Sequence, residues 1–223
     1  MRKQFLTALC VSIFLATTSS YAATTSLGNV KLNINTPKLK TTSSTTKTAQ
    51  SANVTAMKNK ISALENNLAS VSSNYQKTVN EMVKTLLPKD EIAKLQEKAN
   101  KLKQSSKDNV EINIDIAEDG SVALTNALKS NGESMLKNLS AEKKSLLKKN
   151  MTALASEKAS YTKIASQAKD LISSVKAEPV TAAKLAPELI SLTKTSKESL
   201  SQVKNITKLT ATLSTAMTNA GIK

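Results

Sequence analysis

Residues 54–86 read VTAMKNKISALENNLASVSSNYQKTVNEMVKTL, and this stretch decides the fold. Its apolar residues recur at steps of three or four, from Val54 through Tyr75 to Leu86. That spacing places them along one stripe of an amphipathic helix, with the drift typical of a coiled-coil seam. Pro88 disfavours a helical conformation at the residue before it, so the predicted helix ends near Leu87. Such a helix needs partners, because it cannot bury its own stripe.

The same rhythm returns in the second half of the chain. One stripe follows Ser140, a suitable N-cap, and stops at Glu178-Pro179. Lys158 interrupts this stripe where an apolar residue is expected. A last stripe begins near Thr181 or Pro187 and ends at 219–221. Polar residues also replace apolar ones in that stripe, at Ser196 and Thr210. Such polar seam residues weaken a core and fix helix register.

These stripes predict a mainly α fold. Three helices of about 35 residues make rods of about 50 Å, and a shorter amphipathic helix is predicted over 92–102. Short turns marked by proline favour antiparallel neighbours. We therefore expect an elongated antiparallel helical bundle of three long helices plus a short one. Its core is aliphatic, with few of the aromatic side chains that usually dominate burial.

Residues 109–116, NVEINIDI, depart from this pattern. Their apolar residues alternate with polar ones, which is typical of a strand, and Glu118-Asp119-Gly120-Ser121 reads as a turn. A small β-hairpin over 109–125 is therefore expected, with residues 122–125 as the returning strand. The alternative is a helix with Ser121 as its N-cap that runs through Leu128.

The N-terminal 22 residues have the layout of a cleaved signal peptide. A short cationic start, Arg2-Lys3, precedes an apolar run over 5–16, and small residues at Ser20 and Ala22 fit a cleavage site. We expect an exported protein, periplasmic or secreted, with no transmembrane helix after signal removal. Removal of Arg2 and Lys3 would lower the formal net charge of +15 by two, to +13. It would also remove Cys10, the single cysteine, so we expect no disulfides.

Residues 23–50 are rich in Thr, Ser and Lys and are expected to form a disordered basic tail ahead of a bundle domain at 51–223. The lysines of this tail face no acid before Glu65. They are candidate contacts for a polyanion: Lys31, Lys38, Lys40 and Lys47. The alternative is that the tail is only a solvated spacer.

The residue types present exclude several chemistries. The chain has no His, so a Ser–His nucleophile and a histidine proton shuttle are impossible. Without His and with no mature Cys, a zinc site is improbable on chemical grounds. The acids near Gly120 lack the ligand spacing of a calcium loop, because Ala117 and Asn126 occupy ligand positions. No glycine-rich phosphate loop exists. We expect no enzyme activity, no cofactor and no metal.

The net positive charge allows non-specific binding to polyanions but does not indicate recognition of nucleic-acid bases. The only arginine is Arg2, and bidentate phosphate and guanine contacts are the speciality of arginine. We therefore expect no sequence-specific nucleic-acid binding. The leading hypothesis is a non-enzymatic interaction or structural protein of the periplasm or cell surface, with a protein or anionic polymer as partner. The alternatives are a chaperone-like or lipid-binding bundle, and a membrane-active helical toxin that inserts the 110–128 hairpin.

Overall fold

The computed structural model of the chain describes residues 43–222, with side chains from residue 51 on. Every regular element in that range is a helix, which confirms the mainly α prediction for this part of the chain. The helices are α1 (Ser43–Leu86), α2 (Lys89–Lys103), α3 (Asn109–Lys137), α4 (Ala141–Lys176), α5 (Pro179–Lys184) and α6 (Ala186–Asn219).

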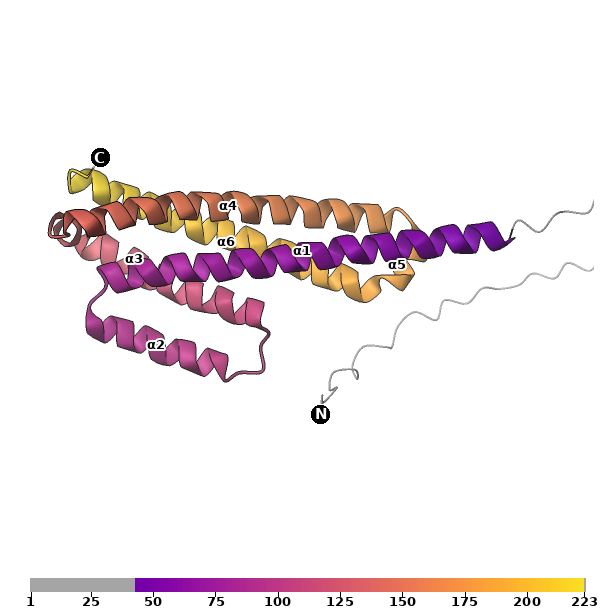
Figure 1. Cartoon of the computed structure of the whole chain (residues 1–223), viewed down its shortest axis with the longest axis horizontal. Helices are drawn as coiled ribbons and strands as arrows, with labels where there is room; N and C mark the ends of the chain where they lie inside the picture. Colours follow the sequence, from indigo (N-terminus) through magenta and orange to yellow (C-terminus); the bar gives the residue numbers. More distant parts are fainter. Residues whose placement is uncertain (1–42, 223) are drawn as a thin grey trace, which may run out of the picture. The chain divides into compact units, whose positions relative to one another are not determined.

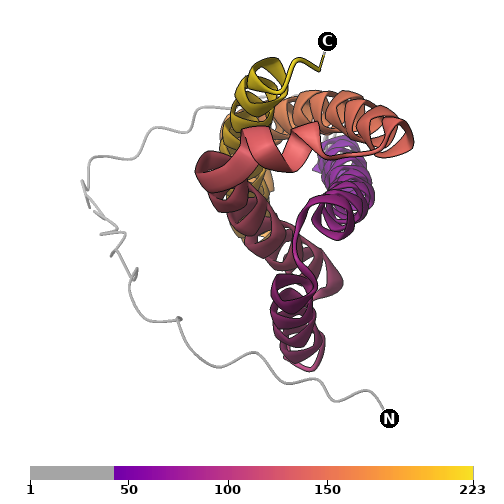
Figure 2. The same cartoon turned by 90° about the vertical axis from the view of Figure 1, so that its left-hand side faces the viewer.

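Four long helices form the bundle. α1 and α6 each pack against both α3 and α4, so the four make a closed ring (Figure 1). α2 packs on α3 from outside this ring, as the end-on view shows (Figure 2), and none of its residues is fully buried. The short α5 connects α4 to α6. The structure thus has one more long helix than the sequence predicted.

The helix directions also differ from the antiparallel prediction. α1, α3 and α6 run the same way, and only α4 of the four runs against them (Figure 1). The contacts agree. Tyr75 meets Ser121 in the parallel pair α1–α3, while Tyr75 and Thr78 meet Tyr161 and Glu157 in the antiparallel pair α1–α4. The reason is α2, which carries the chain back along the bundle before α3 begins (Figure 1).

The expected β-hairpin over 109–125 is wrong, because these residues lie within α3. Asp108 caps this helix by accepting a hydrogen bond from the Glu111 N–H at 2.9 Å. Ile112 and Ile114 are both buried, although two residues on a helix are about 200° apart. A helix can bury both only when it is covered on two sides. Here α1 and α6 cover one side and α2 covers the other.

Gly120, expected in a turn, lies in the middle of α3 and allows close packing. A Cβ atom at this position would lie 2.6 Å from Cγ1 of Val79 on α1, which is too near for ordinary contact. The alternative of a helix that starts at Ser121 is also wrong, since α3 is already helical before this residue.

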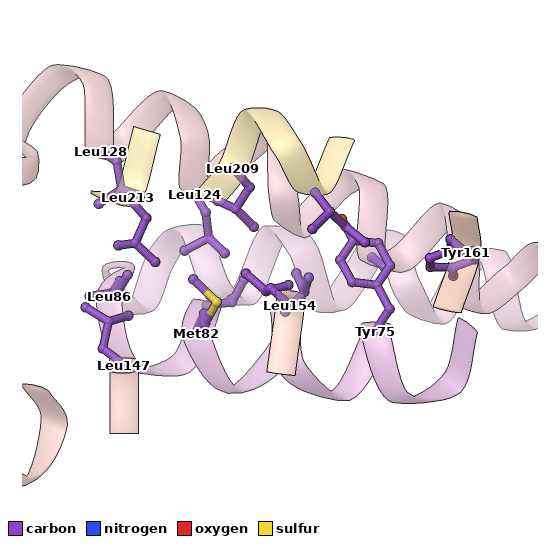
Figure 3. Close-up of a cluster of buried hydrophobic side chains, with 14 of the residues drawn as sticks. Tyr75, Met82, Leu86, Leu124, Leu128, Leu147, Leu154, Tyr161, Leu209 and Leu213 are labelled. Atoms are coloured by element: carbon purple, nitrogen blue, oxygen red, sulfur yellow. The ribbon is translucent and has the colours of Figure 1, made fainter. Parts of the chain in front are cut away.

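The core follows the stripe that residues 54–86 predicted. Seven stripe residues of α1 are buried: Ile61, Leu64, Leu68, Tyr75, Val79, Met82 and Leu86. Figure 3 shows part of this core, where Met82 and Leu86 of α1 lie among leucines of α3, α4 and α6. This interior is mainly aliphatic, with Tyr75 and Tyr161 as its buried aromatic side chains.

Several predictions concern residues outside the described range. The signal peptide at 1–22 and the tail residues 23–42 lie there, and α1 begins at Ser43, within the segment that we expected to be disordered. Among the helices between residues 43 and 222, none combines the length and apolar character needed to cross a bilayer.

Candidate functional site

α4 carries the largest number of lysines and the largest net positive charge among the described helices. It begins at Ser140, whose hydroxyl accepts a hydrogen bond from the Lys143 N–H at 3.3 Å. The helix contains eight lysines against three acids. Its inward face meets α1 and α6, so most of its polar residues turn outward, with Asn150 and Glu157 as buried exceptions. Six of its lysines are exposed and two are half-buried. We call these eight the α4 lysine surface: Lys143, Lys144, Lys148, Lys149, Lys158, Lys163, Lys169 and Lys176.

The charges of the α4 lysine surface are not neutralised within the bundle. Between the described side chains, the seven ion pairs use lysines of α1, α2, α3, α6 and the loop before α3, and none uses a lysine of α4. One of the three acids of α4, Glu157, is buried, and burial raises its pKa to about 7. Glu157 is therefore only about half ionised near neutral pH, which weakens the acidic charge of α4 further.

The acids of the bundle gather instead on α3. Its first three turns carry Glu111, Asp115, Glu118 and Asp119. Lysines from three other segments pair with them: Lys98 of α2 with Asp119 at 3.5 Å, Lys107 of the preceding loop with Asp115 at 2.5 Å, and Lys194 of α6 with Glu111. Three of these four acids thus have lysine partners from neighbouring segments, whereas no α4 lysine takes part in an ion pair between the described side chains.

An open groove of about 770 Å³ adjoins the start of α4. It lies between the last turns of α3 and α6 and is lined mainly by amide and hydroxyl side chains, together with Lys129, Glu133 and Lys137. Lys144 links this region to α4, because its ammonium group donates a hydrogen bond to the Lys137 carbonyl at 3.2 Å. Lys137 itself is paired with Glu133 at 2.6 Å, so the groove adds little positive charge to the α4 lysine surface.

The tail lysines predicted as polyanion contacts are not described. Lys31, Lys38 and Lys40 lie outside the described residues, and Lys47 lies in α1 with its side chain undescribed. The α4 lysine surface was missed at the level of sequence. A signal for it exists, since residues 143–156 contain four lysines and no acid.

A second notable feature is a group of polar side chains inside the bundle, here called the polar layer: Tyr75, Thr78, Ser121, Glu157, Tyr161 and Ser199. The Thr78 hydroxyl donates to Glu157 Oε1 at 2.7 Å, and the Tyr75 and Ser121 hydroxyls share a hydrogen bond of 2.7 Å. The two tyrosine rings meet edge to face, with centroids 6.0 Å apart.

Several atoms of the polar layer have no partner. Glu157 Oε2, the Tyr161 hydroxyl and the Ser199 hydroxyl are buried without a hydrogen bond. Burial raises the pKa of Tyr75 to about 12 and raises the pKa of Tyr161 further. These groups are thus protonated and neutral at physiological pH, apart from Glu157, which titrates near pH 7. Glu157 is only 7% exposed and both rings are fully enclosed, so the layer offers no access to a substrate in the closed bundle.

Within residues 43–222, no cluster of three or more acids, histidines or cysteines is arranged to hold a metal ion. A scan of protein-family models and searches of curated proteins and of solved structures found no match to this chain. Functional inference therefore depends on the α4 lysine surface and the polar layer.

Proposed function

We propose that this chain is an exported, non-enzymatic interaction protein whose bundle presents the α4 lysine surface to anionic polymers of a cell envelope. The observation that carries the proposal is the unpaired state of these lysines among the described side chains. From Lys143 to Lys176 they follow a single straight helix, and at 1.5 Å per residue this spans about 50 Å. A long cationic edge suits an extended polymer better than a small ligand.

The residues between these lysines favour a polymer over a lipid bilayer. The exposed positions Thr152, Ala155, Ser156 and Ala159 are small or polar. A helix that binds at a bilayer surface needs large apolar side chains on the face that enters the headgroup region. This face of α4 has none of them at those positions. Lysine also acts as a point charge, which suits non-specific, salt-sensitive contact with repeated phosphates or carboxylates.

The two alternatives have less support. The membrane-active hypothesis depended on a hairpin at 110–128, and those residues belong to α3. A chaperone-like or lipid-binding bundle would need an apolar interior that opens to a client. The middle of this interior holds the polar layer, and that composition does not favour an apolar client.

The test is binding of the chain to an immobilised linear polyanion, such as polyphosphate or a polyuronate, at about 50 and 500 mM NaCl. A triple variant, Lys148→Gln with Lys149→Gln and Lys163→Gln, removes three charges of the α4 lysine surface. At about 1 kcal/mol per lysine near an anionic surface, we expect the affinity at low salt to fall by at least tenfold. The salt dependence should also become weaker.

The matched control removes the same amount of charge elsewhere. Lys98→Gln, Lys101→Gln and Lys107→Gln change three lysines that are paired with acids. This control should bind nearly as the original chain does. Equal losses in both triple variants would mean that only net charge matters and would refute the site. Binding to anionic vesicles but not to the polymers would refute the choice of partner.

A further inference from the structure

Glu157 is an ionisable group enclosed near the middle of α4. It is 7% exposed, and only one of its two carboxyl oxygens has a hydrogen-bond partner, the Thr78 hydroxyl of α1. A protonated carboxyl tolerates such a site, because it is neutral. An ionised carboxylate does not, since it needs several donors to replace its lost hydration.

We propose that the polar layer is a proton-controlled switch, which keeps the bundle closed while Glu157 is protonated and loosens the α1–α4 seam once Glu157 loses its proton. All four long helices contribute to this layer. Tyr75 and Thr78 belong to α1, Ser121 to α3, and Glu157 and Tyr161 to α4. On α6, Ser199 is buried next to Glu198, whose charge acts on Tyr161.

The groups that face the polar layer supply no positive charge to hold an ionised Glu157. α1 presents Tyr75 and α4 presents Tyr161, and the carboxyl groups that act on these two hydroxyls are Glu157 itself, Glu118 of α3 and Glu198 of α6. Glu157 itself is affected by burial and by the Thr78 hydrogen bond. No lysine acts on Tyr75, Glu157 or Tyr161. Loss of the proton therefore creates an uncompensated charge inside the bundle, which water must reach.

The pH range follows from proton linkage. The closed bundle keeps the pKa of Glu157 at about 7, while an exposed glutamate has an ordinary pKa of 4.5. Stability from the protonated group is greatest below pH 4.5 and is lost as the pH rises through about 7. From these two values, the equilibrium constant for opening should increase about tenfold between pH 6 and pH 8. It should change little above pH 8, because both states are then ionised.

The experiment measures the opening equilibrium of the full chain by urea unfolding at pH 6, 7 and 8. In the original chain, the equilibrium constant for unfolding should rise about tenfold from pH 6 to pH 8. Glu157→Gln keeps the shape but not the ionisation, so its stability should be nearly independent of pH. Asp170→Asn changes an exposed acid of the same helix and should behave as the original chain does. A flat profile in the original chain, or an unchanged slope in Glu157→Gln, would overturn the proposal.

A second variant and a hydrogen-exchange measurement complete the test. If Glu157→Gln does not fold, Thr78→Val provides a second test. It removes the hydrogen bond that lowers the pKa of Glu157 in the closed bundle, so the loss of stability should continue to higher pH than in the original chain. Hydrogen exchange, corrected for its intrinsic pH dependence, locates the opening. At pH 8, the exchange rates of amides in α1 and α4 near Thr78 and Glu157 should rise more than those in the rest of the bundle. A uniform gain across all helices would contradict opening at this seam.

Discussion

The two buried tyrosines should respond in opposite directions to the same change. Tyr75 and Tyr161 are both fully buried and pack edge to face, but only the Tyr75 hydroxyl has a partner, Ser121 at 2.7 Å. Removal of the Tyr161 hydroxyl in Tyr161→Phe deletes a buried polar group that lacks a hydrogen bond. A group of this kind costs about 1–3 kcal/mol, so we expect a gain in unfolding free energy of about 1 kcal/mol.

Tyr75→Phe is the matched control. It keeps the ring and the ring–ring contact, but it leaves the Ser121 hydroxyl, which is 3% exposed, without its partner. We expect a loss of about 1–2 kcal/mol for the same reason. Urea unfolding at pH 6, where Glu157 is mainly protonated, measures both differences. For a domain of this size, 1 kcal/mol corresponds to a shift in Tm of about 2–4 °C. A loss of stability in Tyr161→Phe would refute the reasoning, because it would mean that the hydroxyl is hydrogen-bonded in solution.

Two further predictions concern close packing and titration. Gly120→Ala should gain about 1 kcal/mol of helix propensity but lose about 1–3 kcal/mol to the contact with buried Val79. It should therefore be neutral or destabilising in the original chain and stabilising in a Val79→Ala background. A double-mutant cycle by urea unfolding measures this, and equal effects in both backgrounds would contradict the contact. In Tyr21→Phe, the remaining tyrosines are Tyr75 and Tyr161, and burial raises the pKa of both. Absorbance at 295 nm should therefore show no tyrosinate until about pH 12, and titration near pH 10 would show that the rings are accessible.

The sequence was sufficient to predict a helix and its buried face where only one face of that helix is covered. α1 shows this most clearly, because its apolar residues follow a single stripe and the partners bury that stripe. It was insufficient for α3, where period-two apolar residues are equally compatible with a strand and with a helix covered on two sides. The location of α2 decides between them, and that is a tertiary property that no local pattern contains.

Glu157 illustrates the same limit at a single position. Between Leu154 and Tyr161, a helical stripe can continue through residue 157 or through residue 158, and both residues are charged in this chain. The sequence analysis treated Lys158 as the interruption, whereas the structure buries Glu157 and leaves Lys158 half-buried. The partner of Glu157 is the Thr78 hydroxyl, a donor 79 positions away in the chain, and no local pattern shows that the two will meet.

The unpaired lysines of α4 were hidden for a related reason. Lysine is frequent throughout the chain, and the sequence does not say which lysines meet acids. The structure separates them, because α3 collects acids and is surrounded by α2, α6 and the loop that precedes it, while α4 has its outward face free. Charge segregation of this kind arises from helix arrangement and not from composition.

α4 carries both proposed features, since its lysines face outward and Glu157 faces inward, and magnitudes decide whether they interact. The two faces of a helix are about 10 Å apart. At that distance an effective dielectric constant of 20–80 gives about 0.4–1.7 kcal/mol per charge pair before screening. At physiological ionic strength the Debye length is about 8 Å, which reduces this coupling well below 1 kcal/mol. Ionisation of Glu157 should therefore act on closure of the bundle far more than on the affinity of the α4 lysine surface. Polyanion binding that stays nearly constant between pH 6 and pH 8, while stability falls, is the behaviour that two separate features on one helix require.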